Sequence, residues 1–181
     1  MDSIIQAVVV WLNSVVIGLN LCPFSAKPTR ENRVRFQVSL ATDEESLLED
    51  LMFEMELLDK TSSADIETTL LIAPQVLHDF FDYNQFLIWA ESRIKSRGWK
   101  GIYQLASFHP QYCFAGAEAD AVENLTNRSP YPILHIIREE SLTAALNYIH
   151  DVEGIPERNK KRVQELTTEE KYSLFPYLFR P

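Results

Sequence analysis

Four stretches of the chain have the hydrophobic pattern of β-strands. In RVRFQVSL, residues 33–40, apolar and polar side chains alternate strictly, which is the period of a strand with one buried face. TTLLIA (68–73) is a short apolar run ended by Pro74, which is typical of a strand covered on both faces. The runs IYQLASF (102–108) and ILHIIR (133–138) predict a third and a fourth strand.

Apolar residues at helical spacing separate these strands. Thr42 and Glu45 have the spacing of a capping box, and the leucines and methionines that follow predict a helix with one core-facing side. A long aromatic helix is predicted over 76–97. SLTAALNYI (141–149), capped by Ser141, predicts another helix. The elements therefore alternate between strand and helix along the chain.

The N-terminal run IIQAVVVWLNSVVIGLNL is as apolar as a membrane segment, but it lacks the uninterrupted length of a membrane-spanning helix and the positive charge of an export signal. Gln6 and Asn13 interrupt it, whereas a membrane-spanning helix needs about 20 apolar residues. Asp2 stands where an export signal carries positive charge. We expect a mostly buried helix that ends at Gly18, and no membrane partner.

The C-terminal part predicts one more helix, whose first residue is Pro156, and an aromatic tail, LFPYLF (174–179), that docks on the core. Strands alternating with helices predict an α/β fold. We expect a single domain over 1–181, with about four strands in a mixed or mainly parallel sheet and helices packed on it. At least three strands are expected to be parallel, with right-handed crossovers.

Composition and charge narrow the classes of function. The 181 residues are 46% hydrophobic and include only five glycines, so the chain should bury an ordinary core. A net charge of -9 repels a phosphate backbone, so no nucleic-acid partner is expected. The two cysteines, Cys22 and Cys113, are too few for a disulfide scaffold. They fit a reducing compartment, so we expect a cytoplasmic protein.

The segment 109–132, between the third and fourth strands, is longer than most connections in compact domains, and such segments are often functional. A short helix is expected within it, at AEADAVENL. His109 stands at the carboxyl end of the third strand, where open α/β sheets bind ligands. This position makes His109 the first candidate for a functional residue.

The direction of the fourth strand decides which side chains approach His109. An antiparallel strand would bring Asn127, Arg128 and Ser129 close, whereas a parallel one would bring Arg138 instead. Either arrangement sets an arginine beside the histidine, and a guanidinium binds carboxylate or phosphate bidentately. We therefore expect a small anionic molecule as the partner.

Three motifs, GLNLCPF (18–24), SFHPQYCFAG (107–116) and NRSPYPILH (127–135), resemble those of an uncharacterised bacterial family known only as a domain of unknown function. The resemblance covers essentially the whole chain and implies no activity. It implies that five residues hold motif positions, whereas Cys113 falls on a variable one. The five residues are Cys22, His109, Asn127, Arg128 and His135.

The preferred hypothesis is a small-molecule enzyme of hydrolase or transferase type. Cys22 would be the nucleophile and His109 its general acid or base, with Asn127 or Asp120 orienting the imidazole. The anionic substrate would be held by Arg128, together with Ser129 or Arg138. The C-terminal end of the first helix lies just before Cys22, and its dipole disfavours a thiolate. The alternative for Cys22 is a small buried hydrophobe.

Two other classes of function stay open. A metal site could draw on His109, His135, Cys113, Cys22 and Asp120, although neither a Cys-x-x-Cys nor a His-Glu-x-x-His motif is present. His135, in the middle of an apolar strand, is expected rather as a hydrogen-bonded core histidine.

The other alternative is a non-catalytic interaction domain that docks through the aromatic helix or the terminal LFPYLF. Against it, the aromatic residues follow core spacing. Glycine-rich phosphate loops and the G-x-S-x-G motif are absent from the sequence. The pattern predicts neither a cofactor nor an oligomeric state.

Overall fold

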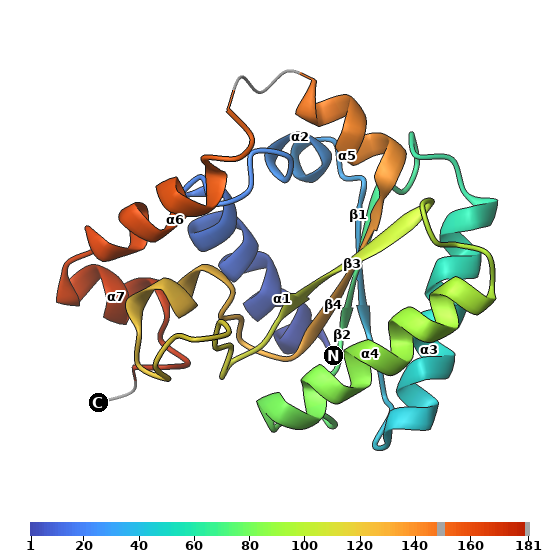
Figure 1. Ribbon diagram of the computed structural model, residues 1–181, viewed down its shortest axis with the longest axis horizontal. Coiled ribbons are helices and arrows are strands. Elements are labelled where there is room, and N and C mark those ends of the chain that lie inside the picture. Colours follow the sequence, from blue (N-terminus) through green and yellow to red (C-terminus); the bar gives the residue numbers. More distant parts are fainter. Residues whose placement is uncertain (148–150, 180–181) are drawn as a thin grey trace.

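A computed structural model describes residues 1–147 and 151–179. Its centre is a four-stranded sheet with the strand order β1-β2-β4-β3 (Figure 1). The strands are β1 (Val34–Val38), β2 (Thr68–Ile72), β3 (Tyr103–Phe108) and β4 (Ile133–Arg138). All four predicted strands are confirmed, with ends that differ from the prediction by at most two residues.

The sheet is mixed, which is one of the two forms expected, mixed or mainly parallel. β1 and β2 are parallel neighbours, whereas β4 runs antiparallel to both β2 and β3. Three strands thus share one direction, but β4 separates β3 from the other two. The expectation of three parallel strands holds for direction and not for pairing, because the chain returns from β3 to β4 as a wide hairpin.

One face of the sheet is covered by α3 (Glu44–Lys60) and α4 (Phe80–Ser96). The N-cap of α3 is Asp43, whose carboxylate accepts the backbone N–H of Ser46 at 2.8 Å. The predicted capping box was therefore wrong by one residue, because a carboxylate competes well for this position.

The α4 helix starts four residues later than predicted. Leu77 has a positive φ of 58°, which is incompatible with a helix, and Asp79 caps the new start. The aromatics of α4 only partly follow the predicted core spacing. Tyr83 and Phe86 are buried, whereas Phe81 is 69% exposed.

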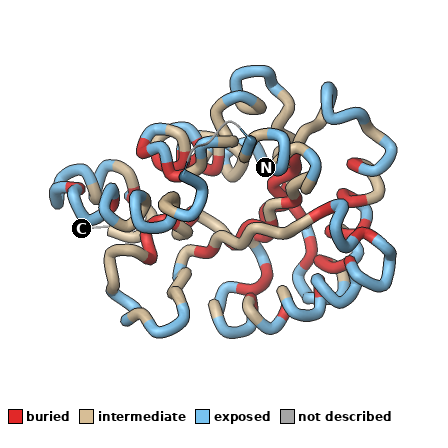
Figure 2. The backbone as a smooth tube through the Cα atoms, turned by 45° about the horizontal axis from the view of Figure 1, so that its top comes forward, coloured by how far each residue is buried: buried red, intermediate tan, exposed pale blue. Residues whose placement is uncertain are grey.

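The other face carries α1 (Asp2–Trp11), its π-helical continuation η1 (Leu12–Ile17), α6 (Ile155–Gln164) and α7 (Thr168–Leu174). Phe175 is fully buried there, so the expected docking of the aromatic tail on the core is confirmed. Figure 2 shows buried residues along the strands and on the inner sides of the helices, with exposed residues outside.

The first helix covers only one half of this face. Trp11 packs edge-on against Phe108, with ring centroids 5.1 Å apart, near the carboxyl end of β3. At the opposite half, the short α2 (Ala26–Arg30) and α5 (Glu139–Leu146) flank the sheet (Figure 1). This half is where β1 and β2 begin and β4 ends.

The α5 helix begins directly after β4, with Arg138 as its N-cap, so the predicted cap at Ser141 was wrong. The backbone passes from strand to helix without a loop in which a serine could serve as a cap. Residues 148 and 149 of the predicted helix lie outside the described part of the chain. Of the segment 117–125, predicted as a short helix before β4, only the second part is helical: it belongs to a 3-10 helix, η2 (Val122–Thr126).

Candidate functional site

His109 lies at the end of β3, as expected, but both of its ring nitrogens are already bonded. Its Nε2 donates to the carbonyl of Leu77 at 2.9 Å, and its Nδ1 accepts the backbone N–H of Gln111 at 3.0 Å. The side chain is fully buried beside the rings of Phe80 and Tyr83. Burial lowers the pKa of His109 from its ordinary value, so the neutral form is favoured.

The antiparallel β4 brings Asn127 to His109, as one of the two alternatives predicted. The N–H of His109 donates to the carbonyl of Asn127 at 3.2 Å, and the Asn127 side chain donates to the carbonyl of Ser107. Asn127 therefore ties the end of β3 and the residue after it to the loop that precedes β4. Within the described residues, the Asn127 side chain has no hydrogen bond to the His109 imidazole.

The guanidinium of Arg128 braces the loop between β3 and β4. It donates to the carbonyl of Tyr112 at 3.2 Å and to that of Ala119 at 2.5 Å. The carbonyl of Arg128 in turn accepts from Trp11 Nε1 and from the Tyr177 hydroxyl. Ser129 is buried and donates to its own turn, at the carbonyl of Tyr131.

The predicted site around His109 is thus a network in which side chains hold backbone groups. Proton transfer by His109 would require at least one of its two hydrogen bonds to break, and anion binding by Arg128 would require the guanidinium to leave two carbonyls. Each loss leaves polar groups without partners, which costs about 1–3 kcal/mol per group. The catalytic assignment of these residues stays a prediction that this geometry does not favour.

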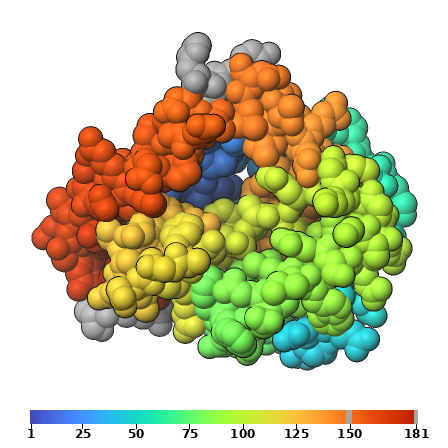
Figure 3. All heavy atoms as spheres, viewed as in Figure 1, coloured from blue at the N-terminus to red at the C-terminus, as the bar shows by residue number. Residues whose placement is uncertain are grey.

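A cavity of about 920 Å³ lies at the other end of the sheet, between α2 and α5. We call it the α2–α5 pocket. Its floor is the half of the sheet that α1 leaves open, with the start of η1 beside it. In Figure 3 a hollow opens beside α5, with the blue N-terminal segment visible inside it. The apolar part of its lining includes Leu12, Val34, Leu70, Ile137, Leu142 and Ala145.

Cys22 reaches this pocket because of the turn that follows η1. Gly18 ends the helix, and a Cβ there would lie 2.3 Å from the carbonyl oxygen of Ser14. Asn20 then takes a positive φ of 56°, which reverses the chain. The side chain of Asn159 from α6 fixes the turn by donating to the carbonyl of Leu21 at 2.7 Å.

The thiol of Cys22 is held mainly in its neutral form. Burial raises the pKa of Cys22, while the backbone N–H groups of Phe24 and Ser25 and the Ser25 hydroxyl act in the opposite direction. His135 lines the same pocket as Cys22, whereas His109 does not. Among the residues that the structure describes, no hydrogen bond joins the Cys22 sulfur to a histidine.

His135 points from the middle of β4 toward the pocket. It pairs with Leu70 of β2 in the sheet register, and its Nε2 lies 2.7 Å from the Thr68 hydroxyl. Burial lowers the pKa of His135 from its ordinary 6.5 to about 4. The prediction of a hydrogen-bonded histidine is confirmed, but the residue also lines a cavity, which its position in an apolar strand did not predict.

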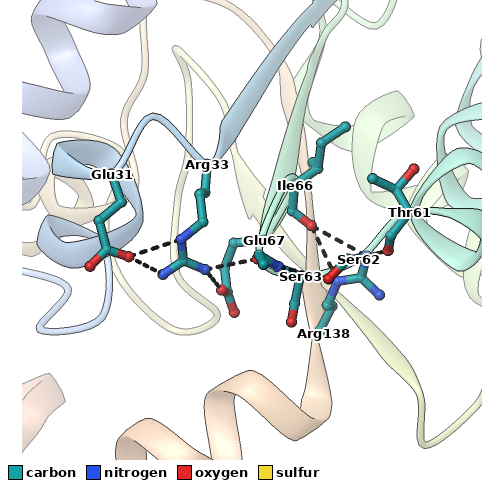
Figure 4. Close-up of polar contacts among 9 residues, drawn as sticks. Glu31, Arg33, Thr61, Ser62, Ser63, Ile66, Glu67 and Arg138 are labelled. Atoms are coloured by element: carbon teal, nitrogen blue, oxygen red, sulfur yellow. Dashed lines mark hydrogen bonds and ion pairs between the residues drawn. The ribbon is translucent and has the colours of Figure 1, made fainter.

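Two arginines form the rim of the pocket (Figure 4). Arg33 lies between Glu31 and Glu67, with which it forms ion pairs, and it also donates to the carbonyl of Ser63 at 2.8 Å. Arg138 donates to the carbonyls of Leu58 and Thr61, each at 2.7 Å. Arg138 thereby holds the segment 61–63, which completes the rim.

The lining of the pocket is more positive than the chain as a whole. It contains three cations, Lys27, Arg33 and Arg138, and two carboxylates, Glu67 and Glu140. Arg33 is neutralised by its two acidic partners. Within the described residues, neither Lys27 nor Arg138 forms an ion pair. These two cations stand out on a chain with a net charge of -9.

The structure separates the predicted site residues into two groups. His109, Asn127, Arg128 and Ser129 lie together at the carboxyl end of β3. Cys22 and Arg138 lie in the α2–α5 pocket at the opposite end of the sheet. No pattern in the sequence pointed to a pocket role for Lys27, Arg33 or Thr68. The motif positions of Cys22 and His135 were the available signal, since these two residues share the cavity.

The described residues include no group of three or more histidine, cysteine, aspartate or glutamate side chains that could hold a metal ion. The metal hypothesis therefore gains no support from the arrangement. Among the described helices, none is both long and apolar enough to cross a membrane. The hypothesis of an interaction domain, the cytoplasmic location and the absence of a nucleic-acid partner stay predictions.

Comparison with known proteins gives a family without an assigned function. Neither the curated proteins nor the solved structures include a match to this chain. A family model described as "Protein of unknown function (DUF1415)" matches residues 3–173, which is nearly the whole sequence. The chain therefore belongs to this family, and the expected membership in a domain of unknown function is confirmed.

Proposed function

We propose that the protein binds a small organic anion with a substantial apolar part in the α2–α5 pocket. The observation that carries this proposal is the composition of the cavity wall. Its floor is apolar, and it includes two cations, Lys27 and Arg138, that form no ion pair within the described residues. Ligand pockets of about 300–1,000 Å³ with mainly apolar walls and a few placed polar groups are typical of small-molecule sites. The cavity of about 920 Å³ falls within this range.

The two cations differ in what they offer a ligand. Arg138 is partly buried and bonded to carbonyls, so it acts mainly through its charge, which solvent screens incompletely at such a position. Lys27 is exposed on α2, and its flexible side chain can contact a ligand carboxylate directly. A carboxylate at the rim would place the apolar part of the ligand over Leu70 and Ile137.

The arrangement supports binding more strongly than covalent turnover. A thiol nucleophile requires a thiolate, and the raised pKa of Cys22 disfavours it. A base beside the thiol would correct this, but His135 has a lowered pKa and no hydrogen bond to Cys22. If the protein is an enzyme, we propose Cys22 as the nucleophile and His135, instead of His109, as its general acid or base.

The test is displacement of a fluorescent anion, 1-anilinonaphthalene-8-sulfonate, by sodium decanoate. Ala145 lines the pocket from α5, so Ala145→Trp should fill the cavity and abolish binding of both compounds. Thr143→Trp is the matched control, because Thr143 lies on the same helix and is exposed. Equal binding by the two variants would refute the proposed site.

Chemical modification gives a second readout at the same place. In a Cys113→Ser background, bound decanoate should slow the alkylation of Cys22 by N-ethylmaleimide, because Cys22 lines the pocket. Ala145→Trp should remove the effect of decanoate on this rate. An alkylation rate that decanoate does not change at saturating concentration would count against the pocket as its binding site.

A further inference from the structure

The hydrogen bonds around Thr68 define which nitrogen of His135 carries the proton. The Thr68 hydroxyl lies 2.5 Å from the carbonyl oxygen of Ile136 and 2.7 Å from His135 Nε2. A hydroxyl has one hydrogen to donate, and the carbonyl can only accept. The bond to the imidazole must therefore be donated by Nε2–H, and the lone pair of the ring lies on Nδ1.

That lone pair faces the cavity. Within the described residues, Nδ1 of His135 has no hydrogen-bond partner. Among the described side chains, only one buried nitrogen or oxygen lacks a partner, and that atom is Oγ1 of Thr69. Nδ1 of His135 is therefore not a buried atom. An unpartnered Nδ1 that is not a buried atom must be open to the pocket that His135 lines. The ring cannot easily turn away, because Thr68 is itself buried and fixed in β2.

We infer that His135 is a recognition residue, and that the ligand of the α2–α5 pocket is an organic acid with a hydroxyl or amide N–H in its apolar part. This inference rests on the proposed function. It goes further by naming the hydrogen-bond donor that the pocket requires in the ligand. The donor of the ligand binds to Nδ1 of His135, while the carboxylate lies at the rim near Lys27. A hydroxy acid or an acylated amino acid has this combination of groups.

The selectivity follows from the cost of burying an acceptor without a partner. A purely apolar chain over His135 would displace water from Nδ1 and give no hydrogen bond in return. A ligand with a donor at the right carbon should therefore bind roughly tenfold more tightly than the same acid without one. Cys22 adds little to this selectivity, because a thiol is a weak acceptor.

The experiment compares decanoate with a series of hydroxydecanoates that carry the hydroxyl at successive carbons. At least one isomer should bind about tenfold more tightly than decanoate to the unmodified protein. In His135→Phe the ratio should fall to about one, while decanoate still binds. Thr143→Trp is the control that should keep the preference, since it changes α5 outside the pocket.

A second measurement uses the unmodified chain, so it does not depend on the folding of a variant. With histidine labelled by nitrogen-15, the Nδ1 resonance of His135 should move toward the protonated value when the preferred isomer binds. Decanoate should leave it nearly unchanged.

Binding of decanoate without any preference among the isomers would overturn this inference and leave the proposed function standing. A preference that survives in His135→Phe would overturn it as well. If neither decanoate nor any hydroxydecanoate displaces the fluorescent anion, the proposed function itself fails.

Discussion

Replacement of His135 by glutamine should remove a large part of the acid sensitivity of the fold. The pKa of His135 is lowered from 6.5 to about 4, so the unfolded chain takes up the proton at a higher pH than the folded one. Stability from this residue is complete above pH 6.5 and is lost as the pH falls toward 4. Below that pH, folded and unfolded states are both protonated, and His135 causes no further loss.

The magnitude follows from these two pKa values. Between pH 7.5 and pH 5, linkage gives a loss of about 2 kcal/mol in the free energy of unfolding from His135 alone. His135→Gln keeps a donor for the Thr68 hydroxyl and cannot titrate, so its free energy of unfolding should fall about 2 kcal/mol less over the same interval. Other groups, His109 among them, contribute equally to both proteins and cancel in the comparison.

Urea unfolding followed by tryptophan fluorescence, at half-unit steps of pH, measures this difference. His78→Gln, at an exposed position, controls for the loss of an imidazole as such. If the unmodified protein and His135→Gln lose the same free energy between pH 7.5 and pH 5, then the fold does not hold the imidazole of His135 in its neutral form.

Three further substitutions test contacts outside the α2–α5 pocket. His109→Ala removes two buried hydrogen bonds, to Leu77 and Gln111. It should lower the free energy of unfolding, measured by urea titration, by about 3 kcal/mol. A loss below about 1 kcal/mol would contradict the view that His109 holds these two backbone groups in place. Arg128→Met should accelerate amide hydrogen exchange in 112–121, and unchanged exchange there would show that the guanidinium does not hold this loop. Arg35→Met leaves the carboxylate of Glu54, which is 2% exposed, without its ion-pair partner. We expect the free energy of unfolding in urea to fall by about 3–5 kcal/mol. Adding Glu54→Leu should restore most of this loss, because it removes the unpaired charge.

The strands could be predicted from the sequence because their signals are local. Alternation in β1 and the apolar run of β2 are properties of a few adjacent residues. The place of β4 between β2 and β3 is set by packing among distant segments, which no short pattern records. The same reason explains why Arg33 and Arg138, far apart in the chain, could not be placed on one rim.

The candidate site was predicted at the end of the sheet that has the longest loop. Loop length and an arginine near a histidine do not distinguish a binding loop from one that is braced internally. The difference depends on where Leu77 and Gln111 place their backbone groups, and these positions follow from the fold. Cys22 was identified as a candidate, but its pocket partner is a histidine from a strand interior, where a polar residue usually serves only the core.

The position of β4 also determines when the sheet can form during synthesis. Among the described strands, β3 pairs with β4 alone, so it has no neighbour until residues 133–138 have left the ribosome. Until then β2 has one unpaired edge as well, because its second partner is also β4. A chain that stops before this strand exposes two apolar edges, which favours association between chains. Completion of the last strand therefore joins three segments in one step and makes the fold depend on contacts distant in sequence.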